Sequence, residues 1–501
     1  MDTKNLVIQA VFIGKPQYEA GWPYLGYDPL TLEKTIMDHL HEKFPDVTVK
    51  KNEIITTYDK RLNSEIINDV QHADGLLIFT IGHYGDPGLI QSAVDILSVK
   101  KIPTVLANLI YAGDHTFVKL YTSIKDKGFF VYPVSSRRIE DFDKSIGILF
   151  DALGMKGKKI LTVASDTNAP DWNRITGLVT PEISKIAKTM PVFLDQVTKL
   201  KASKFEFFTD LKGVDQAHQW RKDEKLYVKN LQDVFGVGMQ REDPMEIVKY
   251  YDQASEAAAK PIAEKWTKQA KLVEPAKQTI VNSARLYIGL KKLMEDKKVH
   301  FLAPDCGTLL LIGKMPAYPC MGFFELTNDG CYGICESDMD AAISYMFGEA
   351  LSKGRPGFVS NHTIDLSANQ ITYMHCVAAN RLLGINGPAA DFDIVHHGET
   401  GIIGASPRVK FPIGESFTTI KISVFAKKMA LYVGKIIDNV NDKGGCVTKV
   451  LVQIKDARKL LETYDWETFG WHRVSFVGDW QEQFKIGARL LGLELFDYSS
   501  L

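Results

Sequence analysis

Short apolar runs alternate with helical segments through the first hundred residues, and this alternation leaves few folds open to the chain. The runs end in polar or Gly-containing turns, whereas the segments between them carry apolar residues at helical spacing. The runs are Asn5–Ile13, Thr48–Ile55, Gly75–Thr80 and Thr104–Ala107, and the helical segments are Leu30–Phe44, Leu62–His72 and Leu89–Val99. Strands that alternate with helices form a parallel sheet covered on both faces, so this part is predicted to be Rossmann-like.

Two loops after predicted strands are too long and too rich in aromatic and polar residues to be simple turns. They are Gly14–Pro29, with Tyr18 and Trp22, and Gly82–Gly88, with His83, Tyr84 and Asp86. Ligands of parallel sheets lie beyond the carboxyl ends of the strands, so either loop is a candidate binding surface, and a plain connector is the alternative. Gly14–Pro29 contains no Gly-x-Gly-x-x-Gly motif, which argues against a dinucleotide-binding enzyme.

The length and the changes of pattern predict three domains. A single core stops growing at roughly 250–300 residues, and this chain has 501. A new strand pattern begins at Lys159, and beyond Gly354 short strands separated by Gly, Pro and Asn predict a small antiparallel barrel or sandwich. We therefore expect an α/β protein with two Rossmann-like parallel-sheet domains, 1–155 and 156–354, followed by an antiparallel β-barrel-like domain, 355–501.

Charge and composition exclude several classes of partner. Lys and Arg number 60 against 61 Asp and Glu, with no basic stripe, so a nucleic-acid or anionic-membrane surface is not expected. No apolar run approaches the ~20 residues that span a bilayer, and the first residues lack the pattern of a signal peptide. The six cysteines are sparse and predicted to be buried free thiols. We expect a cytoplasmic protein.

The residues with chemical potential gather in the C-terminal half. Glu336 stands where a loop enters a predicted helix, His375 ends a predicted strand, and His472 precedes another. A carboxylate and imidazoles from the ends of separate elements suit a divalent metal. A capping carboxylate and two core histidines are the alternative, with a capping contribution under ~1 kcal/mol. His396–His397 with Glu399 is the most metal-like local cluster, but neighbours on a strand point to opposite faces.

The order of these pieces resembles the L-fucose isomerase / L-arabinose isomerase superfamily. Four blocks carry the resemblance, and they cover the C-terminal third of the chain. They are Ala303–Cys306, Leu326–Ala342 (LTNDGCYGICESDMDAA), Gly357–Val359 followed by Tyr373–Cys376, and Gly470–Leu495 (GWHRVSFVGDWQEQFKIGARLLGLEL). The resemblance implies two Rossmann-like domains followed by a barrel-like one, which agrees with the domains predicted above.

The resemblance also implies site residues. It makes Glu336 and His472 ligands of a divalent ion, usually manganese, and matches His375 to the histidine of the arabinose-isomerase branch. It implies a second carboxylate where this chain has Ser360 or Asn361, neither of which ionises usefully; Asn361 could still ligate the metal through its amide oxygen, but it cannot carry a proton. A replacement acid/base is then sought among Asp365, His362 and the loop 396–399, whose His397 is expected to contact substrate.

The expected function is a metal-dependent sugar isomerase that interconverts an aldose and a ketose, a pentose or 6-deoxyhexose, through an ene-diol. Two groups flanking C1 and C2 must exchange a proton while the metal polarises the oxygens. The resemblance implies a homotrimer or homohexamer in which Trp22, His83 and Tyr84 of a neighbour help to close each site. Because the second acid is missing, the alternatives are a lyase, epimerase or glycoside-cleaving enzyme on the same scaffold, or non-catalytic sugar binding.

Overall fold

The computed structural model describes most of the chain as two compact units. The described residues are 6–17, 22–82, 85–164, 216–243, 245–306, 317–398, 404–442, 444–470 and 472–498. Unit 1 comprises Met1–Lys156, Val234–Gly236 and Glu482–Leu495, and unit 2 comprises Gly157–Asp233, Val237–Gln481 and Phe496–Leu501. The predicted boundary at 155 therefore lies at the edge of unit 1, whereas the predicted second and third domains share unit 2.

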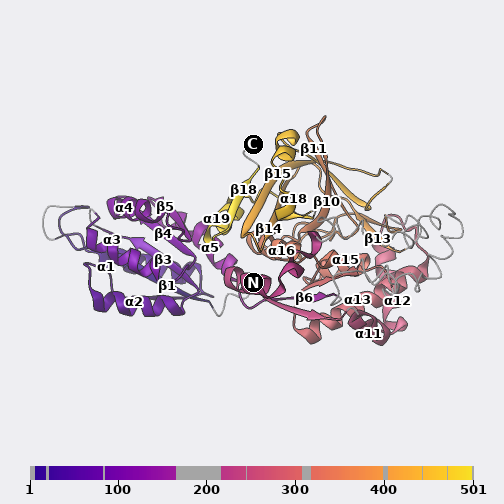
Figure 1. The fold of residues 1–501 in the computed structure, drawn as a ribbon, viewed down its shortest axis with the longest axis horizontal. Helices are drawn as coiled ribbons and strands as arrows, with labels where there is room; N and C mark the ends of the chain where they lie inside the picture. The colour runs from indigo at the N-terminus through magenta and orange to yellow at the C-terminus, as the bar shows by residue number, and fades with distance from the viewer. Residues whose placement is uncertain are drawn as a thin grey trace. The chain divides into compact units, whose positions relative to one another are not determined.

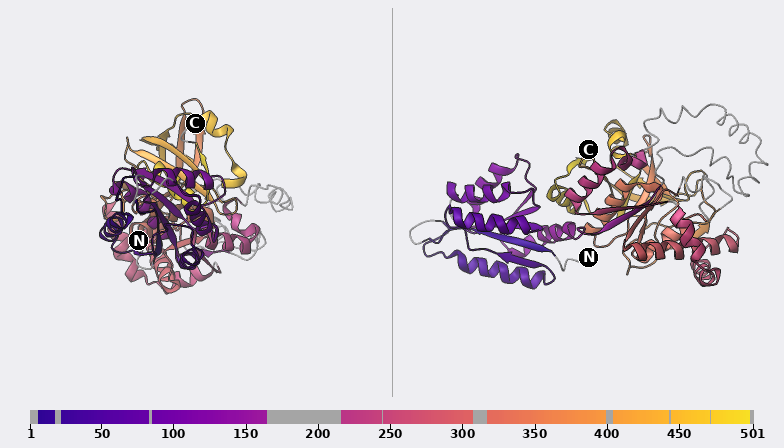
Figure 2. Two further views of the ribbon diagram at one scale, coloured as in Figure 1. Left: turned by 90° about the vertical axis from the view of Figure 1, so that its left-hand side faces the viewer. Right: turned by 60° about the horizontal axis from the view of Figure 1, so that its bottom comes forward.

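Unit 1 is built on a parallel sheet of five strands in the order β2-β1-β3-β4-β5. The strands are β1 (Val7–Ile13), β2 (Thr48–Lys51), β3 (Gly75–Thr80), β4 (Thr104–Leu109) and β5 (Val131–Ser136), and the helices are α1 (Pro29–Lys43), α2 (Lys60–His72), α3 (Pro87–Ser98), α4 (Asp114–Ile124) and α5 (Asp143–Leu153). Both faces of the sheet are covered by helices (Figures 1 and 2). On one face Val11, Ile78 and Leu106 pack with the apolar sides of α2, α3 and α4. The predicted alternation of strands and helices is confirmed.

Unit 2 contains a second parallel sheet, in the order β7-β6-β8-β9. Its strands are β6 (Lys159–Val163), β7 (Gly238–Glu242), β8 (Phe301–Pro304) and β9 (Tyr332–Gly333), and the helices around it are α10 (Glu224–Phe235), α11 (Met245–Gln253), α12 (Glu256–Gln269), α13 (Lys277–Lys297), α15 (Cys320–Asn328) and α16 (Met339–Leu351). The long helix α13 buries Leu286, Leu290 and Leu293 against its neighbours. Helix α16 is apolar on nearly every side and is buried almost throughout.

The C-terminal region of unit 2 is a closed antiparallel barrel of six strands, as predicted. The barrel strands are β10 (Phe358–Asp365), β11 (Gln370–His375), β14 (Ser416–Ser423), β15 (Lys428–Asn439), β16 (Thr448–Gln453) and β17 (Arg473–Val477). They follow the order β14-β17-β10-β11-β16-β15, and β15 pairs with β14 to close the ring. A ribbon, β12 (Phe392–Val395) with β13 (Ser406–Val409), forms a separate sheet that contacts the barrel through Thr448 of β16, and β18 (Glu494–Asp497) extends the barrel sheet beside β15.

Two short helices, α17 (Ala457–Glu462) and α18 (Trp466–Phe469), connect β16 to β17, and α19 (Gln481–Leu490) precedes β18 and lies almost wholly in unit 1. Within the described ranges no helix has the length and apolar character needed to cross a membrane. All six cysteines are free thiols, and every one except the half-buried Cys331 is buried.

Candidate metal centre

Glu336 lies in a strained turn between β9 and α16. Its backbone is left-handed, with φ 60° and ψ 27°, and Ser337 follows with φ 53°. Such angles are costly for residues other than glycine and persist only where the surroundings enforce them. Ser337 holds this turn in place. Its hydroxyl lies 2.6 Å from that of Thr162, and its carbonyl accepts the Trp220 indole N–H at 3.0 Å. The turn leaves the Glu336 side chain 35 % exposed.

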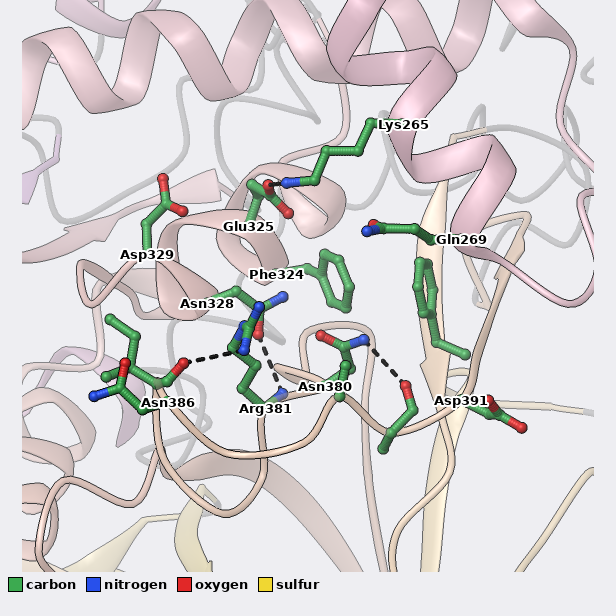
Figure 3. A pocket seen from close by; sticks show the side chains of 14 residues that line it. Lys265, Gln269, Phe324, Glu325, Asn328, Asp329, Asn380, Arg381, Asn386 and Asp391 are labelled. Atoms are coloured by element: carbon green, nitrogen blue, oxygen red, sulfur yellow. Dashed lines mark hydrogen bonds and ion pairs between the residues drawn. The ribbon is translucent and has the colours of Figure 1, made fainter.

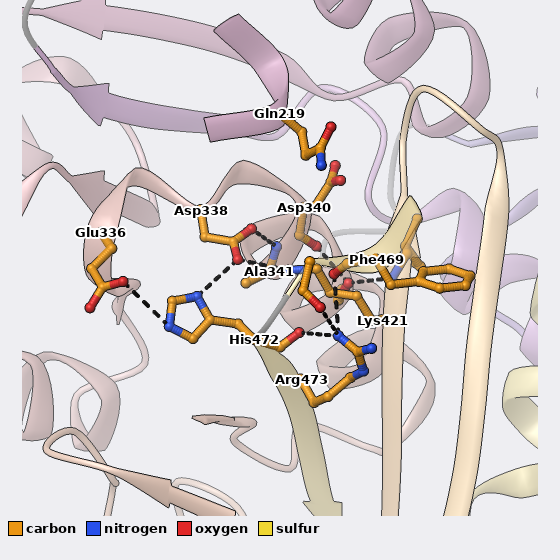
Figure 4. A network of polar contacts seen from close by, with 12 residues as sticks. Gln219, Glu336, Asp338, Asp340, Ala341, Lys421, Phe469, His472 and Arg473 are labelled. Carbon is orange, nitrogen blue, oxygen red and sulfur yellow. Dashed lines mark hydrogen bonds and ion pairs between the residues drawn. The ribbon is translucent and has the colours of Figure 1, made fainter. Parts of the chain in front are cut away.

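The carboxylate that caps α16 is Asp338, not Glu336. Asp338 Oδ1 accepts the backbone N–H of Ala341 at 2.7 Å, as an N-cap side chain should. The capping interpretation of Glu336 is therefore wrong, because that function is already supplied two residues later. Glu336 directs its carboxylate instead toward the imidazole of His472, with 3.6 Å between Oε2 and Nε2 (Figure 4).

His472 is held from behind by a buried ion pair. Asp338 Oδ2 lies 2.9 Å from His472 Nδ1 and accepts a bond from Lys421 Nζ at 2.7 Å. All three side chains are at most 2 % exposed. Burial alone would raise the pKa of the Asp338 carboxyl, but Lys421 and His472 outweigh it and hold that pKa well below its usual range. The ionised Asp338 fixes the imidazole so that Nε2 faces Glu336.

His375 is the last residue of β11, and its ring lies beside that of His472. The two ring centres are 5.5 Å apart, and His375 is only 4 % exposed. Neither ring nitrogen of His375 has a hydrogen-bond partner among the described residues. Burial lowers the pKa of His375 to about 4, and the neighbouring His472 adds to this effect. His375 is therefore neutral near pH 7, the form in which an imidazole donates a lone pair to a metal.

Glu336, His375 and His472 together form a group suited to a divalent ion. One ligand atom from each lies within 4.8 Å of the others, although the residues come from a turn, a strand end and a loop that are far apart in sequence. One carboxylate and two imidazoles suit several divalent ions, manganese among them. Asp338 behind His472 is the outer partner that metal-bound histidines commonly have. One of the two unpartnered ring nitrogens of His375 would gain a partner, so the residues fit a metal.

The position expected to hold a second carboxylate is taken by Ser360. Asn361 pairs with Met374 across β10 and β11, so strand alternation places Asn361 on the opposite face from His375. The prediction of Asn361 as a ligand is not supported for this reason. Ser360 shares the face of His375, lies opposite Arg473, and is fully buried with an unpartnered hydroxyl in the described part of the chain.

Asp365 is not at the site, which corrects its prediction as a catalytic residue. It ends β10 in an exposed turn, where its carboxylate accepts bonds from Ser367 and from the backbone of Ala368. These bonds lower the pKa of Asp365, as expected for a turn residue. His362 lies further along β10, with its ring 6.1 Å from that of Tyr373 and 5.3 Å from that of Tyr464, inside the barrel.

His397, in the loop after β12, packs against Tyr318, with 4.7 Å between the ring centres and the ring planes tilted by 42°. Trp22, in unit 1, is half-buried with its ring 5.6 Å from that of His115. His83, Tyr84 and Glu399 lie outside the described residues.

Two supporting residues, Lys421 and Asp340, were not predicted from the sequence. Lys421 is the only charged residue in the run FTTIKISVFA, and a lone lysine in a buried strand signals a buried partner. Asp340 stands two residues after Asp338 in the sequence ESDMD. Its Oδ1 accepts bonds from the Tyr227 hydroxyl at 2.7 Å and from the backbone N–H of Val424 at 3.3 Å.

Asp340 should make stability fall as the pH rises. Burial raises its pKa from 3.8 to about 6, with Asp338 adding to the effect and Lys421 opposing it. The folded chain then holds this proton more tightly than the unfolded chain, so the free energy of unfolding drops between about pH 4 and 6 by on the order of 3 kcal/mol. Urea unfolding of metal-free protein should show this drop, and Asp340→Asn should remove it.

The exposed Asp442→Asn is the matched control for that experiment and should leave the wild-type pH profile in place. An unchanged slope in Asp340→Asn would mean that Asp340 is ionised throughout.

Loss of the partner behind His472 should weaken metal binding without removing the ligands. Asp338→Asn alone would leave the Lys421 ammonium buried and unpaired, so we choose the double variant with Lys421→Met. It should fold and bind Mn²⁺ about 10- to 100-fold more weakly, because outer partners orient the imidazole and raise its basicity. Calorimetric titration of EDTA-treated protein measures this, and wild-type affinity in the double variant would contradict it.

Comparison with protein-family models gives no match for this chain, and no curated protein matches it either.

Proposed function

We propose that the protein is a metal-dependent sugar isomerase that interconverts an aldose and a ketose, a pentose or a 6-deoxyhexose, through an ene-diol. The observation that supports this most is the gathering of Glu336, His375 and His472 within 4.8 Å. The resemblance of the motifs around these residues to the L-fucose isomerase / L-arabinose isomerase superfamily supplies the reaction. The barrel and the two parallel sheets agree with that resemblance.

The surroundings of each ligand residue determine its proposed role at the metal. Glu336, His375 and His472 would hold the ion, which we propose is Mn²⁺, and when bound it would polarise the carbonyl and hydroxyl oxygens of the sugar. His375 binds as a neutral imidazole because burial lowers its pKa. Asp338 and Lys421 keep the His472 ring oriented.

Glu336 is the proposed proton carrier. Its carboxylate is partly exposed and could take the proton from C2 of the aldose and return it to C1. The Ser360 hydroxyl does not ionise near neutral pH, so it cannot serve as the base, and Asp365 is occupied in its turn. We propose His397, from the loop 396–399, as the second group that contacts the substrate.

The test is exchange of the C2 proton. Protein loaded with Mn²⁺ is incubated in D₂O with a panel of pentoses and 6-deoxyhexoses, and NMR follows deuterium incorporation and ketose formation. The proposal expects both for at least one sugar. If every sugar keeps its C2 proton and its aldose form, the isomerase is ruled out.

A second candidate is favoured by the buried Ser360. With a hydroxyl in place of the second carboxylate, the scaffold suits a reaction that needs one acid/base, such as a lyase, epimerase or glycoside-cleaving reaction, or sugar binding without turnover. Exchange at a sugar carbon without formation of a ketose would favour an epimerase or lyase. Binding of Mn²⁺ and sugar with no exchange would favour the non-catalytic form.

We further propose a homotrimer or homohexamer in a reducing cytoplasm. The resemblance places active sites between subunits, with Trp22, His83 and Tyr84 of a neighbour closing each one, and the six free thiols suit a reducing compartment. Light scattering of the purified protein tests the assembly, and a monomer at micromolar concentration would contradict it.

A further inference from the structure

A cavity of about 670 Å³ opens on unit 2 and contains none of the metal-binding residues. Its walls come from the end of α12, from α15, and from the loop 380–391 between β11 and β12 (Figure 3). Cavities that bind small molecules typically enclose ~300–1,000 Å³, so this one has room for a ligand the size of a mono- or disaccharide.

The loop wall of the cavity is held in one shape. Asn380 makes two hydrogen bonds with Ala390. Its side-chain NH₂ donates to the Ala390 carbonyl at 3.0 Å, and its backbone carbonyl accepts the Ala390 N–H at 2.7 Å. The Arg381 guanidinium donates to the carbonyls of Ile385 and Gly387 at 3.2 and 3.1 Å. The loop is therefore closed on itself before any ligand arrives, which lowers the entropy cost of binding.

Each of the three carboxylates around the cavity is already paired with a lysine. Lys265 is paired with Glu325, and Asp329 is paired with Lys291 at 2.6 Å. Asp391 lies 3.3 Å from Lys271. The Arg381 guanidinium keeps its positive charge and donates from Nη1 to the two loop carbonyls. The lining therefore carries two cations, Lys265 and Arg381, against three carboxylates, so an anion would meet no excess of positive charge. Each carboxylate already has a lysine partner, so none is free for a metal ion, and the fitting ligand is neutral.

Four carboxamides offer the hydrogen bonds that such a ligand needs. Gln269 and Asn386 make no hydrogen bond within the described part of the chain, and both line the cavity, with the Gln269 amide directed toward it (Figure 3). The Asn328 side chain makes a hydrogen bond only through its oxygen, which accepts the backbone N–H of Arg381 at 3.2 Å. The Asn380 side chain makes one only through its NH₂ group. A carboxamide presents a donor and an acceptor side by side, which matches a pair of neighbouring hydroxyls.

Two buried rings, Phe324 and Phe392, support the wall of the cavity, with 4.8 Å between their centres. Each is only 2 % exposed, so the rings hold the wall in place and present little apolar surface to a ligand. Recognition therefore depends on the hydrogen-bonding side chains, which suit the hydroxyls of a sugar.

We propose that this cavity is a second, metal-independent binding site for a neutral saccharide. It is distinct from the metal centre in residues and in chemistry, because it offers carboxamides in place of charged ligands. It is nevertheless connected to that centre through the chain, since the loop that forms its wall begins a few residues after His375.

The test separates this site from the metal centre. EDTA-treated protein is mixed in turn with L-arabinose, L-fucose, maltose and cellobiose, and saturation-transfer NMR detects the bound sugar. We expect transfer to at least one of them without metal. The Gln269→Ala, Asn386→Ala double variant should bind that sugar at least tenfold more weakly. Both side chains are exposed, so their loss should leave the fold intact.

Two matched controls complete the experiment. Gln253→Ala removes an exposed carboxamide at the end of α11, away from the cavity, and should keep full transfer. Glu336→Gln should also keep it, since the metal centre takes no part. The proposal is overturned if none of the four sugars shows transfer, if transfer survives in the cavity variant, or if Glu336→Gln abolishes it. It is also overturned if the cavity variant changes the oligomeric mass while the sugars have no effect, because a second copy of the chain would then cover the cavity.

Discussion

Glu336→Gln should bind Mn²⁺ at least ~100-fold more weakly than the wild type and show no detectable sugar turnover. Glutamine keeps the length of the side chain but removes the only negative charge among the three ligands, and a neutral amide is a poor ligand beside two imidazoles. Under the proposed mechanism it also removes the group that carries the proton. Calorimetry on EDTA-treated protein gives the affinity, and the D₂O exchange assay gives the turnover.

The same substitution should leave the fold intact, because the Glu336 side chain is partly exposed and the strained turn is held through Ser337. The metal-free variant should therefore unfold within ~0.5 kcal/mol of the wild type. Glu462→Gln, at the exposed end of α17, is the control and should change neither affinity nor turnover. Full activity in Glu336→Gln would remove Glu336 from the site, whatever the reaction is.

Lys421→Met should be the most destabilising single change near the metal centre, at roughly 3–5 kcal/mol at pH 7. Methionine matches the shape of the lysine stem, so little packing is lost, but the Asp338 carboxylate is left buried without its cation. Urea unfolding measures the loss. Asp338 has a folded pKa below its unfolded value, so its ionised pair stabilises the wild type above about pH 4 and is lost as the pH falls.

The deficit of Lys421→Met should accordingly shrink as the pH falls toward 4, where the wild type begins to lose the pair as well. Adding Asp338→Asn should recover much of the stability, because the buried charge is then gone. Lys435→Met, on an exposed position of β15, should stay within ~0.5 kcal/mol of the wild type. A small, pH-independent effect of Lys421→Met would show that the ion pair contributes nothing.

Local patterns were sufficient to predict the architecture. Runs such as Gly75–Thr80 and Gln370–His375 coincide with β3 and β11, because apolar continuity in the first and alternation in the second are properties of the segment itself. Strand β16, Thr448–Gln453, was missed, although it completes the barrel. It is short, and its apolar residues are the three consecutive Val450, Leu451 and Val452, too few to show a strand period in the sequence. Its pairing with β11 and β15 therefore gives it its structure.

The site was predictable only in part. Glu336, His375 and His472 stand at the ends of elements, which sequence can suggest, but their approach to within 4.8 Å depends on barrel closure. The assignment of Asn361 required the register of β10 against β11, which one residue of slip reverses. Asp365 was misplaced because the length of β10, and hence the position of its terminal turn, is not encoded in the local pattern.

The most direct test of the metal centre is a titration of the purified, EDTA-treated protein with Mn²⁺, read by calorimetry and by the loss of the free-ion EPR signal. The wild type should bind one ion per chain, and His375→Ala and His472→Ala should each weaken that binding at least ~100-fold, while His72→Ala on the exposed end of α2 should not. Failure of the wild type to bind Mn²⁺, or binding that persists in both histidine variants, would contradict the assignment of Glu336, His375 and His472 as a metal centre.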